Sequence, residues 1–408
     1  MADSLKPREA KEVEQAIQWA LAGGKALELV GQGSKRAIGR AAQWDATLDL
    51  SGLSGVTLYE PAELVLSAKA GTPLAEIEAL MAASGQELAF EPMDYGPLLG
   101  GPGAAGTIGG TLAANLSGPR RIKAGAARDH FLGFSAVSGR GETFKSGGRV
   151  VKNVTGYDLC KLLAGSWGTL AAMTEVTVKA LPRGETEETI IALNLDDVSA
   201  GKLMTATVGT AADVSAAAHL PAPVAARVAA ITAASGAVTA FRLEGVAPSI
   251  AHRKAVLEKL TAPFGTLATL AEAASRALWR AVRDVAPFAA AGPAGKRYVW
   301  RISTAPSRGV SVGRKLVDQA GAEIMYDWAG GLIWVALPPT DDAGAALVRS
   351  AVAAASGHAT LIRAPAAVRA AIGVFEPEPA ALAALTKRVR ESFDPRGVLN
   401  AGRMWAGV

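Results

Sequence analysis

TIGGTLAANLSGPRR, residues 107–121, is the stretch of the chain that says most about its fold. Gly109 and Gly110 let the backbone approach a flat or phosphorylated ligand closely, because glycine has no Cβ. Thr107, Thr111 and Asn115 supply side-chain hydrogen bonds, and two consecutive arginines end the segment. We interpret these residues as a ligand-binding segment. The alternative is a glycine-rich helix N-terminus that is tightly packed for structural reasons.

The longest uncharged run of the chain, Tyr95 to Pro119, contains this segment. Its length would suit a membrane-spanning helix. Glycine and proline would break such a helix, and the run contains Gly96, Gly100, Gly101, Gly103, Gly106, Gly109, Gly110 and Gly118, with Pro97 and Pro102. We therefore expect a backbone-rich binding segment and no transmembrane helix.

The first glycine loop of the chain, Gly31-Gln32-Gly33-Ser34-Lys35, follows an expected strand over residues 26–30, and residues 107–121 form the second glycine segment. Its glycines permit positive φ angles, so that consecutive N–H groups can point into one concavity that suits a pyrophosphate. Lys35 adds a positive charge. The loop is not a Rossmann fingerprint, because Arg36 stands where the third glycine would be. The alternative is a plain strand–turn–strand connection.

A third block covers Lys152–Asp158 and Gly165–Thr169. Asn153 and Thr155 are candidate caps for a helix over about residues 157–163. Gly165 and Gly168 predict a tight turn into a strand over residues 174–180. Taken alone, this spacing indicates only a helix, a turn and a strand.

Length and composition limit the classes of function that this chain can have. The 408 residues suffice for two or three domains, and 50% of them are hydrophobic. Lys plus Arg number 42 against 37 Asp plus Glu, and no basic run stands out, so we expect no nucleic-acid binding. The single cysteine, Cys160, excludes an internal disulfide and a cysteine-held iron–sulfur cluster. The charged residues 1–11 predict no signal peptide, which fits a cytoplasmic protein.

The hydrophobic pattern changes after Pro182-Arg183-Gly184 and the acidic residues 185–188. Before this point, short strands and helices alternate irregularly. After it, strands and helices alternate as expected for an α+β sheet with helices on one face. A last helix over about residues 379–392 leads into the tail. We therefore predict a domain boundary near residue 184.

Taken together, these blocks resemble the vanillyl-alcohol-oxidase/PCMH-type FAD-domain family. The blocks are Gly31–Lys35, Thr107–Arg121, Arg128-Asp129, Lys152–Asp158, Gly165–Thr169 and Thr174–Thr177. The resemblance implies an α+β fold in three parts. Residues 1–182 would form an FAD-binding domain of two α+β subdomains, residues 185–375 an α+β cap or substrate domain with an antiparallel sheet, and residues 376–408 a C-terminal helix and tail that return to the FAD domain.

The resemblance also implies the cofactor site. The pyrophosphate of FAD would lie on the first glycine loop, residues 31–35, and the second glycine segment, residues 107–121, would run beside the isoalloxazine. A cation near N1 of a reduced flavin favours reduction, which is the role expected for the paired arginines. The implied FAD-binding residues are Gly31, Gln32, Gly33, Ser34, Lys35, Thr107, Gly109, Gly110, Ala113, Asn115, Ser117, Gly118, Arg120, Arg121, Gly165, Gly168 and Val176.

Within that family, the chain is similar to the FAD-binding subunits of bacterial glycolate oxidases. The blocks that carry this likeness are Gly31–Arg40, Gly118–Arg121, Gly148–Asp158, Leu278–Arg280, Trp300–Ser303, Tyr326–Gly331, Gly357–Thr360 and Asp394–Met404. The likeness implies a complex with a larger FAD-binding catalytic subunit and an iron–sulfur subunit. Such a complex oxidises glycolate and related 2-hydroxy acids to glyoxylate, in the cytoplasm or peripherally at the inner membrane.

Two alternatives to this function stay open. One is a stand-alone FAD-dependent dehydrogenase for another 2-hydroxy acid. The other is a non-catalytic subunit whose FAD is structural or relays electrons. Catalytic relatives carry clustered metal-binding histidines, whereas His130, His219, His252 and His358 are far apart here. We therefore predict no metal site, and this absence favours the second alternative.

The chain departs from the family at two other points: the way in which FAD is attached, and the sequence of the C-terminal tail. No histidine lies in either glycine block, so we expect non-covalent FAD. The tail has Ala401 between Asn400 and Gly402, where relatives usually have proline. The turn can survive that change.

Three residues of the second domain are candidates for substrate chemistry. A hydroxy acid needs a cation for its carboxylate and a base for its hydroxyl proton. Arg301, Asp327 and His358 lie on or next to expected strands, and they meet if those strands share a sheet that faces the flavin. The alternatives are a structural Arg301–Asp327 ion pair and a structural His358. Trp300, Trp328 and Trp334 are expected in the core.

Overall fold

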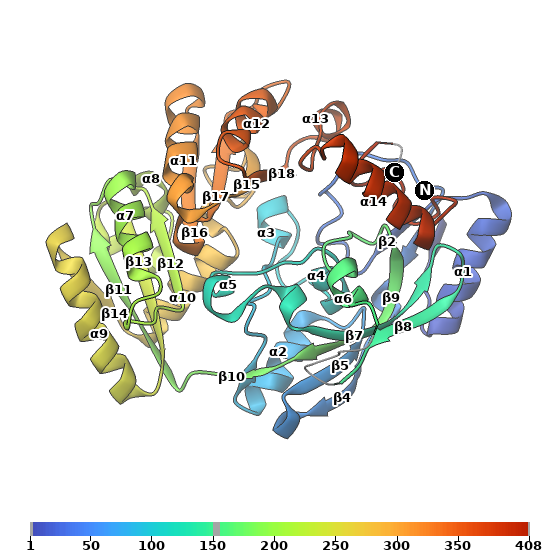
Figure 1. Cartoon of the computed structure of the whole chain (residues 1–408), viewed down its shortest axis with the longest axis horizontal. Coiled ribbons are helices and arrows are strands. Elements are labelled where there is room, and N and C mark those ends of the chain that lie inside the picture. The colour runs from blue at the N-terminus through green and yellow to red at the C-terminus, as the bar shows by residue number, and fades with distance from the viewer. Residues whose placement is uncertain (1–2, 150–155, 407–408) are drawn as a thin grey trace.

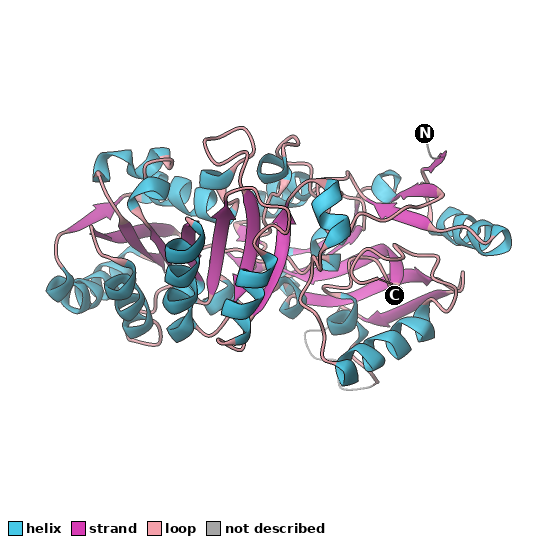
Figure 2. Cartoon of the chain, turned by 90° about the horizontal axis from the view of Figure 1, so that it is seen from above, coloured by secondary structure: helices cyan, strands magenta, loops and turns pink. Residues whose placement is uncertain are grey.

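The structure is a computed structural model that describes residues 3–149 and 156–406. It has two parts, one formed by residues before about 182 and the other by an eight-stranded sheet with its helices (Figure 1). Seen from above, the two parts lie side by side along the longest axis of the molecule (Figure 2). The proposed domain limits at residues 182, 185 and 375 stay a prediction.

The first part begins with a three-stranded parallel sheet in the order β1 (Asp3–Leu5), β3 (Ala46–Asp49), β2 (Leu27–Val30). Helix α1 (Ala10–Gly23) packs on it through Val13, Ile17 and Ala20, which recur at helical spacing. It ends at Gly24, whose φ of 61° is left-handed and therefore favours glycine. This sheet places the loop after β2 at the edge of the pocket described below.

A five-stranded antiparallel sheet completes the first part. Its order is β4 (Val56–Glu60), β5 (Val65–Lys69), β9 (Ala171–Lys179), β7 (Phe131–Ser138) and β8 (Thr143–Gly147). Its helices are α2 (Leu74–Ala83), α3 (Gly96–Leu99), α4 (Ile108–Ala113), α5 (Arg121–Ala124) and α6 (Leu159–Leu163). The expected caps Asn153 and Thr155 lie outside the described residues. Asp158 caps α6 instead, through its carboxylate and the Lys161 N–H.

The second part contains two successive βαββαβ units. The first is β11 (Thr186–Leu193), α7 (Asp197–Thr207), β12 (Ala216–Leu220), β13 (Val238–Gly245), α9 (Ala247–Thr261) and β14 (Leu267–Leu270). The second is β15 (Tyr298–Ser303), α11 (Pro306–Ala320), β16 (Glu323–Asp327), β17 (Leu332–Leu337), α12 (Ala345–Ala353) and β18 (His358–Arg363). Strand order β14-β11-β13-β12-β16-β17-β15-β18 joins them into one antiparallel sheet at the His219–Tyr326 pair. No fixed sequence period reveals this repeat.

The two faces of the eight-stranded sheet have different partners. One packs on the long helices α7, α9, α11 and α12. The other packs on α8 (Ala222–Ala225), α10 (Glu272–Arg283) and residues of the first part such as Tyr95. Helices therefore cover both faces, whereas the sequence predicted one. The reason is that α10 buries Leu278, Trp279 and Val282 against the face shared with the first part.

Short strands and the C-terminal segment tie the parts together. Strand β6 (Gln86–Glu87) pairs with β10 (Leu181–Pro182), at the point where the chain passes from the first part to the second. After α13 (Ala366–Ala371), helix α14 (Ala380–Phe393) packs Phe393 against Phe144 of the five-stranded sheet. The tail then bridges Leu399 to Leu27 of β2. Among the described residues, no helix is both long enough and apolar enough to span a membrane.

Candidate functional site

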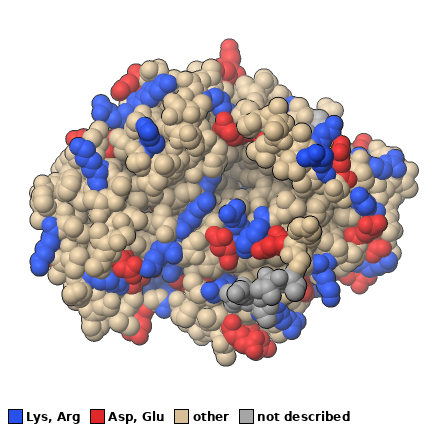
Figure 3. Space-filling model, viewed as in Figure 1, with Lys and Arg blue, Asp and Glu red and all other residues tan. Residues whose placement is uncertain are grey.

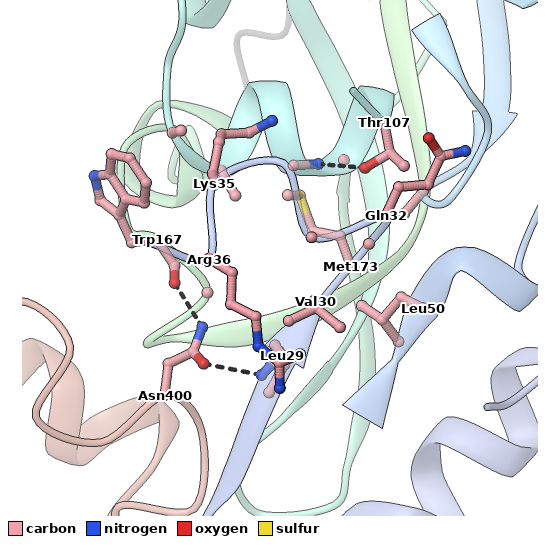
Figure 4. A pocket seen from close by; sticks show the side chains of 18 of the residues that line it. Leu29, Val30, Gln32, Lys35, Arg36, Leu50, Thr107, Trp167, Met173 and Asn400 are labelled. Atoms are coloured by element: carbon pink, nitrogen blue, oxygen red, sulfur yellow. Dashed lines mark hydrogen bonds between the residues drawn. The ribbon is translucent and has the colours of Figure 1, made fainter. Parts of the chain in front are cut away.

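A pocket opens between the loop that follows β2 and the start of α4 (Figure 4). The loop lines one wall, and the backbone of the second glycine segment lines the opposite wall. On the whole molecule, a hollow lies in the middle of the face seen in Figure 3, with charged side chains along it. The pocket is lined by Leu29, Val30, Gly31, Gln32, Gly33, Ser34, Lys35, Arg36, Leu50, Ala70, Thr107, Gly109, Gly110, Ala113, Ala114, Trp167, Gly168, Ala171, Met173, Asn400 and Arg403.

The loop after β2 presents free backbone donors. Among the described residues, no protein acceptor receives a hydrogen bond from the N–H groups of Gln32–Lys35. Gly33 has φ of 79°, and a Cβ there would meet no atom within 4 Å. A Cβ on Gly31 would lie 2.5 Å from Thr107 Oγ1, so only glycine permits this approach to α4. The loop is thus a concave set of N–H donors suited to phosphate oxygens.

Two cations stand beside this loop. Burial lowers the pKa of Lys35 to about 8, and burial lowers that of Arg403 to about 10. Neither forms a salt bridge within the described part of the chain, although Arg403 donates to the Lys35 carbonyl at 2.9 Å. Cations buried without a carboxylate are costly. The pocket is therefore electrostatically prepared for an anionic group.

Asn400 connects the tail to both walls of the pocket. Its Oδ1 accepts a hydrogen bond from the Leu29 N–H at 2.9 Å, and its Nδ2 donates to the Trp167 carbonyl at 2.8 Å. Figure 4 shows both bonds. Asp394 holds the turn that carries it, because its carboxylate accepts from the N–H groups of Val398 and Leu399. The last segment of the chain thus completes a site built mainly from its first third.

The pocket gathers ten of the residues that the sequence assigned to the cofactor. They are Gly31, Gln32, Gly33, Ser34, Lys35, Thr107, Gly109, Gly110, Ala113 and Gly168. Their binding role stays a prediction. The remaining assigned residues lie elsewhere.

Three of these others are engaged in local packing. The Asn115 Oδ1 accepts from the Arg128 N–H at 3.1 Å, and the Ser117 Oγ accepts from the Ala127 N–H at 2.9 Å. Val176 is fully buried in the core of the five-stranded sheet. Gly165 lies next to Asn115 and does not line the pocket.

Gly118, Arg120 and Arg121 point to the seam between the two parts. The Gly118 carbonyl accepts from Trp328 Nε1 at 2.9 Å. Arg120 pairs with Glu87 and, at 3.4 Å, with Glu244. The Arg121 guanidinium lies over the Trp328 ring. These residues join the first part to the second and do not line the pocket.

Sequence reasoning missed the apolar wall and the tail. Leu29, Leu50 and Met173 look like ordinary core residues in the sequence, and nothing local marks them as pocket residues. Asn400 and Arg403 did carry a signal, because they belong to the tail motif that the resemblance included. Their place in the pocket could not be predicted, because it depends on where the tail packs in the folded chain.

The three candidates for substrate chemistry share one face of the eight-stranded sheet. Asp327 pairs with Leu332, Leu332 with Ser303, and Ser303 with His358, so these residues form one cross-strand row. Arg301 precedes Ser303 by two residues and therefore points to the same side. This face packs against the first part, where Tyr95 meets Trp334 with ring centroids 6.2 Å apart.

The environments of these candidates differ. Asp327 is buried, and burial raises its pKa to about 7, although it accepts from the Trp328 N–H at 2.7 Å. His358 is at the open edge of the sheet, where desolvation and then the Arg301 cation lower its pKa. Burial lowers the pKa of Arg301. In the described ranges, Arg301 and Asp327 form no ion pair, so the structural alternative for this pair is not observed.

A buried charge network fixes the seam beside Asp327. Arg242 donates to both carboxylate oxygens of Glu91, at 2.7 and 2.9 Å. Glu244 lies between Arg242 and Arg120, at 3.5 and 3.4 Å. Bidentate, buried pairs of this kind are geometrically demanding. They hold the face that carries Asp327 in one position relative to the first part.

In the described residues, no three or more His, Cys, Asp or Glu side chains are grouped to hold a metal ion. The four histidines do not meet. His219, for example, is fully buried and contacts Thr239 and Asp197.

Comparison with known proteins places the chain among flavoproteins. A family described as FAD binding domain matches residues 4–147. Glycolate oxidase subunit GlcE of Escherichia coli (strain K12) is 31% identical over 396 residues, 96% of either chain. Glycolate oxidase subunit GlcD of Bacillus subtilis (strain 168) is 41% identical over 110 residues, 25% of this chain and 23% of that one.

A solved structure, p-cresol methylhydroxylase with substrate bound, shares the fold. It superposes with a TM-score of 0.71 at 11% identity, over 98% of this chain and 88% of that one. At this identity the likeness concerns the fold alone.

Proposed function

Since the chain belongs to the family of glycolate oxidase subunit GlcE, an FAD-dependent oxidoreductase family, we propose that it is the FAD-binding subunit of a complex that oxidises glycolate to glyoxylate and related 2-hydroxy acids to the corresponding 2-oxo acids. The observation that carries this proposal is a likeness that spans 96% of both chains. The predicted α+β, PCMH-type fold is confirmed by the same family and by the solved structure.

FAD is the cofactor of this family, and the pocket residues fit it. The N–H groups of the loop 31–35, with Lys35 and Arg403, would hold the pyrophosphate. The glycine backbone at residues 109–110 would allow a flat ring to approach. Among the residues that the structure describes, no histidine, cysteine or tyrosine lines the pocket, which supports non-covalent binding. When bound, FAD supplies a two-electron acceptor.

The chain's own residues would act on the substrate from the eight-stranded sheet. Arg301 would bind the carboxylate. Asp327 would take the hydroxyl proton, since a carboxylate with a pKa of about 7 is suited to general-base work near neutral pH. His358, at the open edge, is the second candidate for that proton. The buried seam around these residues would exclude water from the reacting atoms.

The proposal includes partner subunits. A larger FAD-binding catalytic subunit and an iron–sulfur subunit would receive the electrons. A relative named as another glycolate oxidase subunit supports more than one flavin subunit. With a single cysteine, this chain has too few thiolates for a cysteine-held cluster of its own. The complex would be cytoplasmic, with peripheral association at the inner membrane as the alternative.

The test is co-purification followed by anaerobic reduction. The complex and the isolated chain are each purified, their FAD content is measured, and glycolate is added without oxygen. Bleaching of the flavin absorbance in the isolated chain is the expected result. A yellow isolated chain that glycolate does not bleach, next to a complex that it does, would refute oxidation at this subunit.

That outcome would favour a second function, a structural or electron-relay FAD subunit. The separation of His130, His219, His252 and His358 supports this second function, because the catalytic relatives cluster their histidines around a metal. Robust turnover by the isolated chain would instead favour a stand-alone dehydrogenase.

A further inference from the structure

We infer that Arg121 and Arg301, both held on the indole ring of Trp328, form one anion site at the seam that binds the substrate's carboxylate. This inference rests on the proposed function, since it takes the ligand to be a small 2-hydroxy acid. It assigns Arg121 to the substrate, whereas the sequence assigned it to FAD.

The geometry around Trp328 brings the two arginines together from different parts of the chain. The Arg121 Cζ lies 4.4 Å from the centroid of the Trp328 ring, and the Arg301 Cζ lies 5.1 Å from it. Arg121 is the last residue of the second glycine segment and begins α5, whereas Arg301 lies on β15. Cations at these distances are attracted by the face of an indole. A single side chain thus orients both guanidinium groups.

Trp328 itself is held firmly. Its indole N–H donates to the Gly118 carbonyl at 2.9 Å, across the seam. Its backbone is left-handed, with φ of 51°, and Ala329 follows with φ of 57°. A bulky residue in this region is strained by about 1–3 kcal/mol, and such strain concentrates at functional sites. The turn between β16 and β17 therefore holds this ring in position despite the backbone strain.

The charges on the two arginines are not balanced by protein carboxylates. Among the described residues, neither Arg121 nor Arg301 forms a salt bridge or donates a side-chain hydrogen bond. Arg120, the neighbour of Arg121 in sequence, is by contrast paired with Glu87 and Glu244. Burial lowers the pKa of Arg121, and the Arg301 cation lowers it further. Two like charges in a partly buried place require an anion to be favourable.

The position of the two cations matches what a 2-hydroxy acid needs. Arg301 shares its sheet face with Asp327 and His358, and Asp327 accepts from the backbone N–H of Trp328 itself. A carboxylate bound by the two guanidinium groups would therefore lie on the sheet face that carries both candidate bases. Planar guanidinium groups suit a carboxylate because they offer paired N–H donors. Arg121 becomes a specificity-determining residue that the first part of the chain contributes.

The test measures binding of oxalate, a two-carbon carboxylate that this reaction cannot oxidise. FAD-loaded protein is titrated with oxalate at constant ionic strength, and the dissociation constant is measured by calorimetry. Arg121→Gln and Arg301→Gln are each expected to weaken oxalate binding by about tenfold to a hundredfold, with unchanged FAD content. Arg140→Gln is the matched control, because Arg140 is exposed in the turn between β7 and β8, away from Trp328. It is expected to bind oxalate like the unmodified protein.

Trp328 provides a second set of variants. Trp328→Phe keeps an aromatic face and is expected to retain most of the oxalate affinity. Trp328→Leu keeps both arginines but removes the face, and it is expected to approach the affinity of the arginine variants. A structural role alone would lower the melting temperature of both variants without separating their oxalate affinities.

Two results would overturn the inference. One is unchanged oxalate binding by Arg121→Gln, which would remove Arg121 from the site. The other is loss of FAD by the same variant, which would return Arg121 to the cofactor. The proposed function fails separately: if oxalate binding follows the expected pattern but glycolate does not bleach the flavin, the anion site stands and oxidation at this subunit does not.

Discussion

Replacing Asp327 with asparagine is expected to remove a pH-dependent destabilisation of the folded protein. Asp327 is 2% exposed, and burial raises its pKa from 3.8 to about 7. Asparagine has nearly the same shape, and its Oδ1 can still accept from the Trp328 N–H. The change therefore removes the ionisable group and preserves the hydrogen bond.

The raised pKa fixes the sign and the size of the effect. The unfolded chain loses the proton near pH 3.8, whereas the folded protein keeps it until about pH 7. The unmodified protein therefore loses stability as pH rises through this window, by about 1.4 kcal/mol per pH unit. The full loss above pH 7 is about 4 kcal/mol. The advantage of Asp327→Asn should grow by about 2–3 kcal/mol between pH 5 and pH 8.

The assay is urea unfolding of both proteins with saturating FAD at several pH values. Taking the difference between the two free energies of unfolding cancels the other titrating groups. Asp341→Asn, at an exposed site in the loop after β17, is the control for the chemical change itself. A gap between Asp327→Asn and the unmodified protein that stays constant from pH 5 to pH 8 would refute the burial argument. The same variant should lose glycolate oxidation if Asp327 is the base.

Other variants test the pocket and the seam. Gly31→Ala is expected to weaken FAD binding about tenfold or more, because its Cβ would clash with the wall of α4, whereas Gly148→Ala has open space and should bind FAD normally in a fluorescence titration. Asn400→Ala leaves two backbone groups without partners and should lower the free energy of unfolding by about 2–4 kcal/mol; a loss below about 1 kcal/mol would contradict this. Glu91→Gln removes the bidentate carboxylate partner of the buried Arg242, which then keeps only the longer contact to Glu244, and it should cost about 3–5 kcal/mol in urea unfolding, so an unchanged midpoint would show that the pair is not needed at the seam.

The sequence by itself determined the local backbone features. Glycine pairs and short hydrophobic runs predicted the loop after β2, the second glycine segment and the strands beside them, because backbone freedom and side-chain alternation are local properties. Strand β12 carries little such local signal. Alanine-rich Ala216–Leu220 has little β-propensity of its own and is a strand because neighbours on both sides pair with it.

The tertiary structure alone decided which side chains meet. Arg120 and Arg121 are adjacent in sequence and both were assigned to the cofactor, yet one is bound in an ion-pair network and the other lies on Trp328, more than two hundred positions later. Asn400 and Arg403 complete a pocket whose other wall lies near residue 30. The partner of a side chain depends on how distant segments pack, and packing is set by the whole core. Local sequence therefore predicted the backbone of the site, whereas the fold decided which side chains surround it.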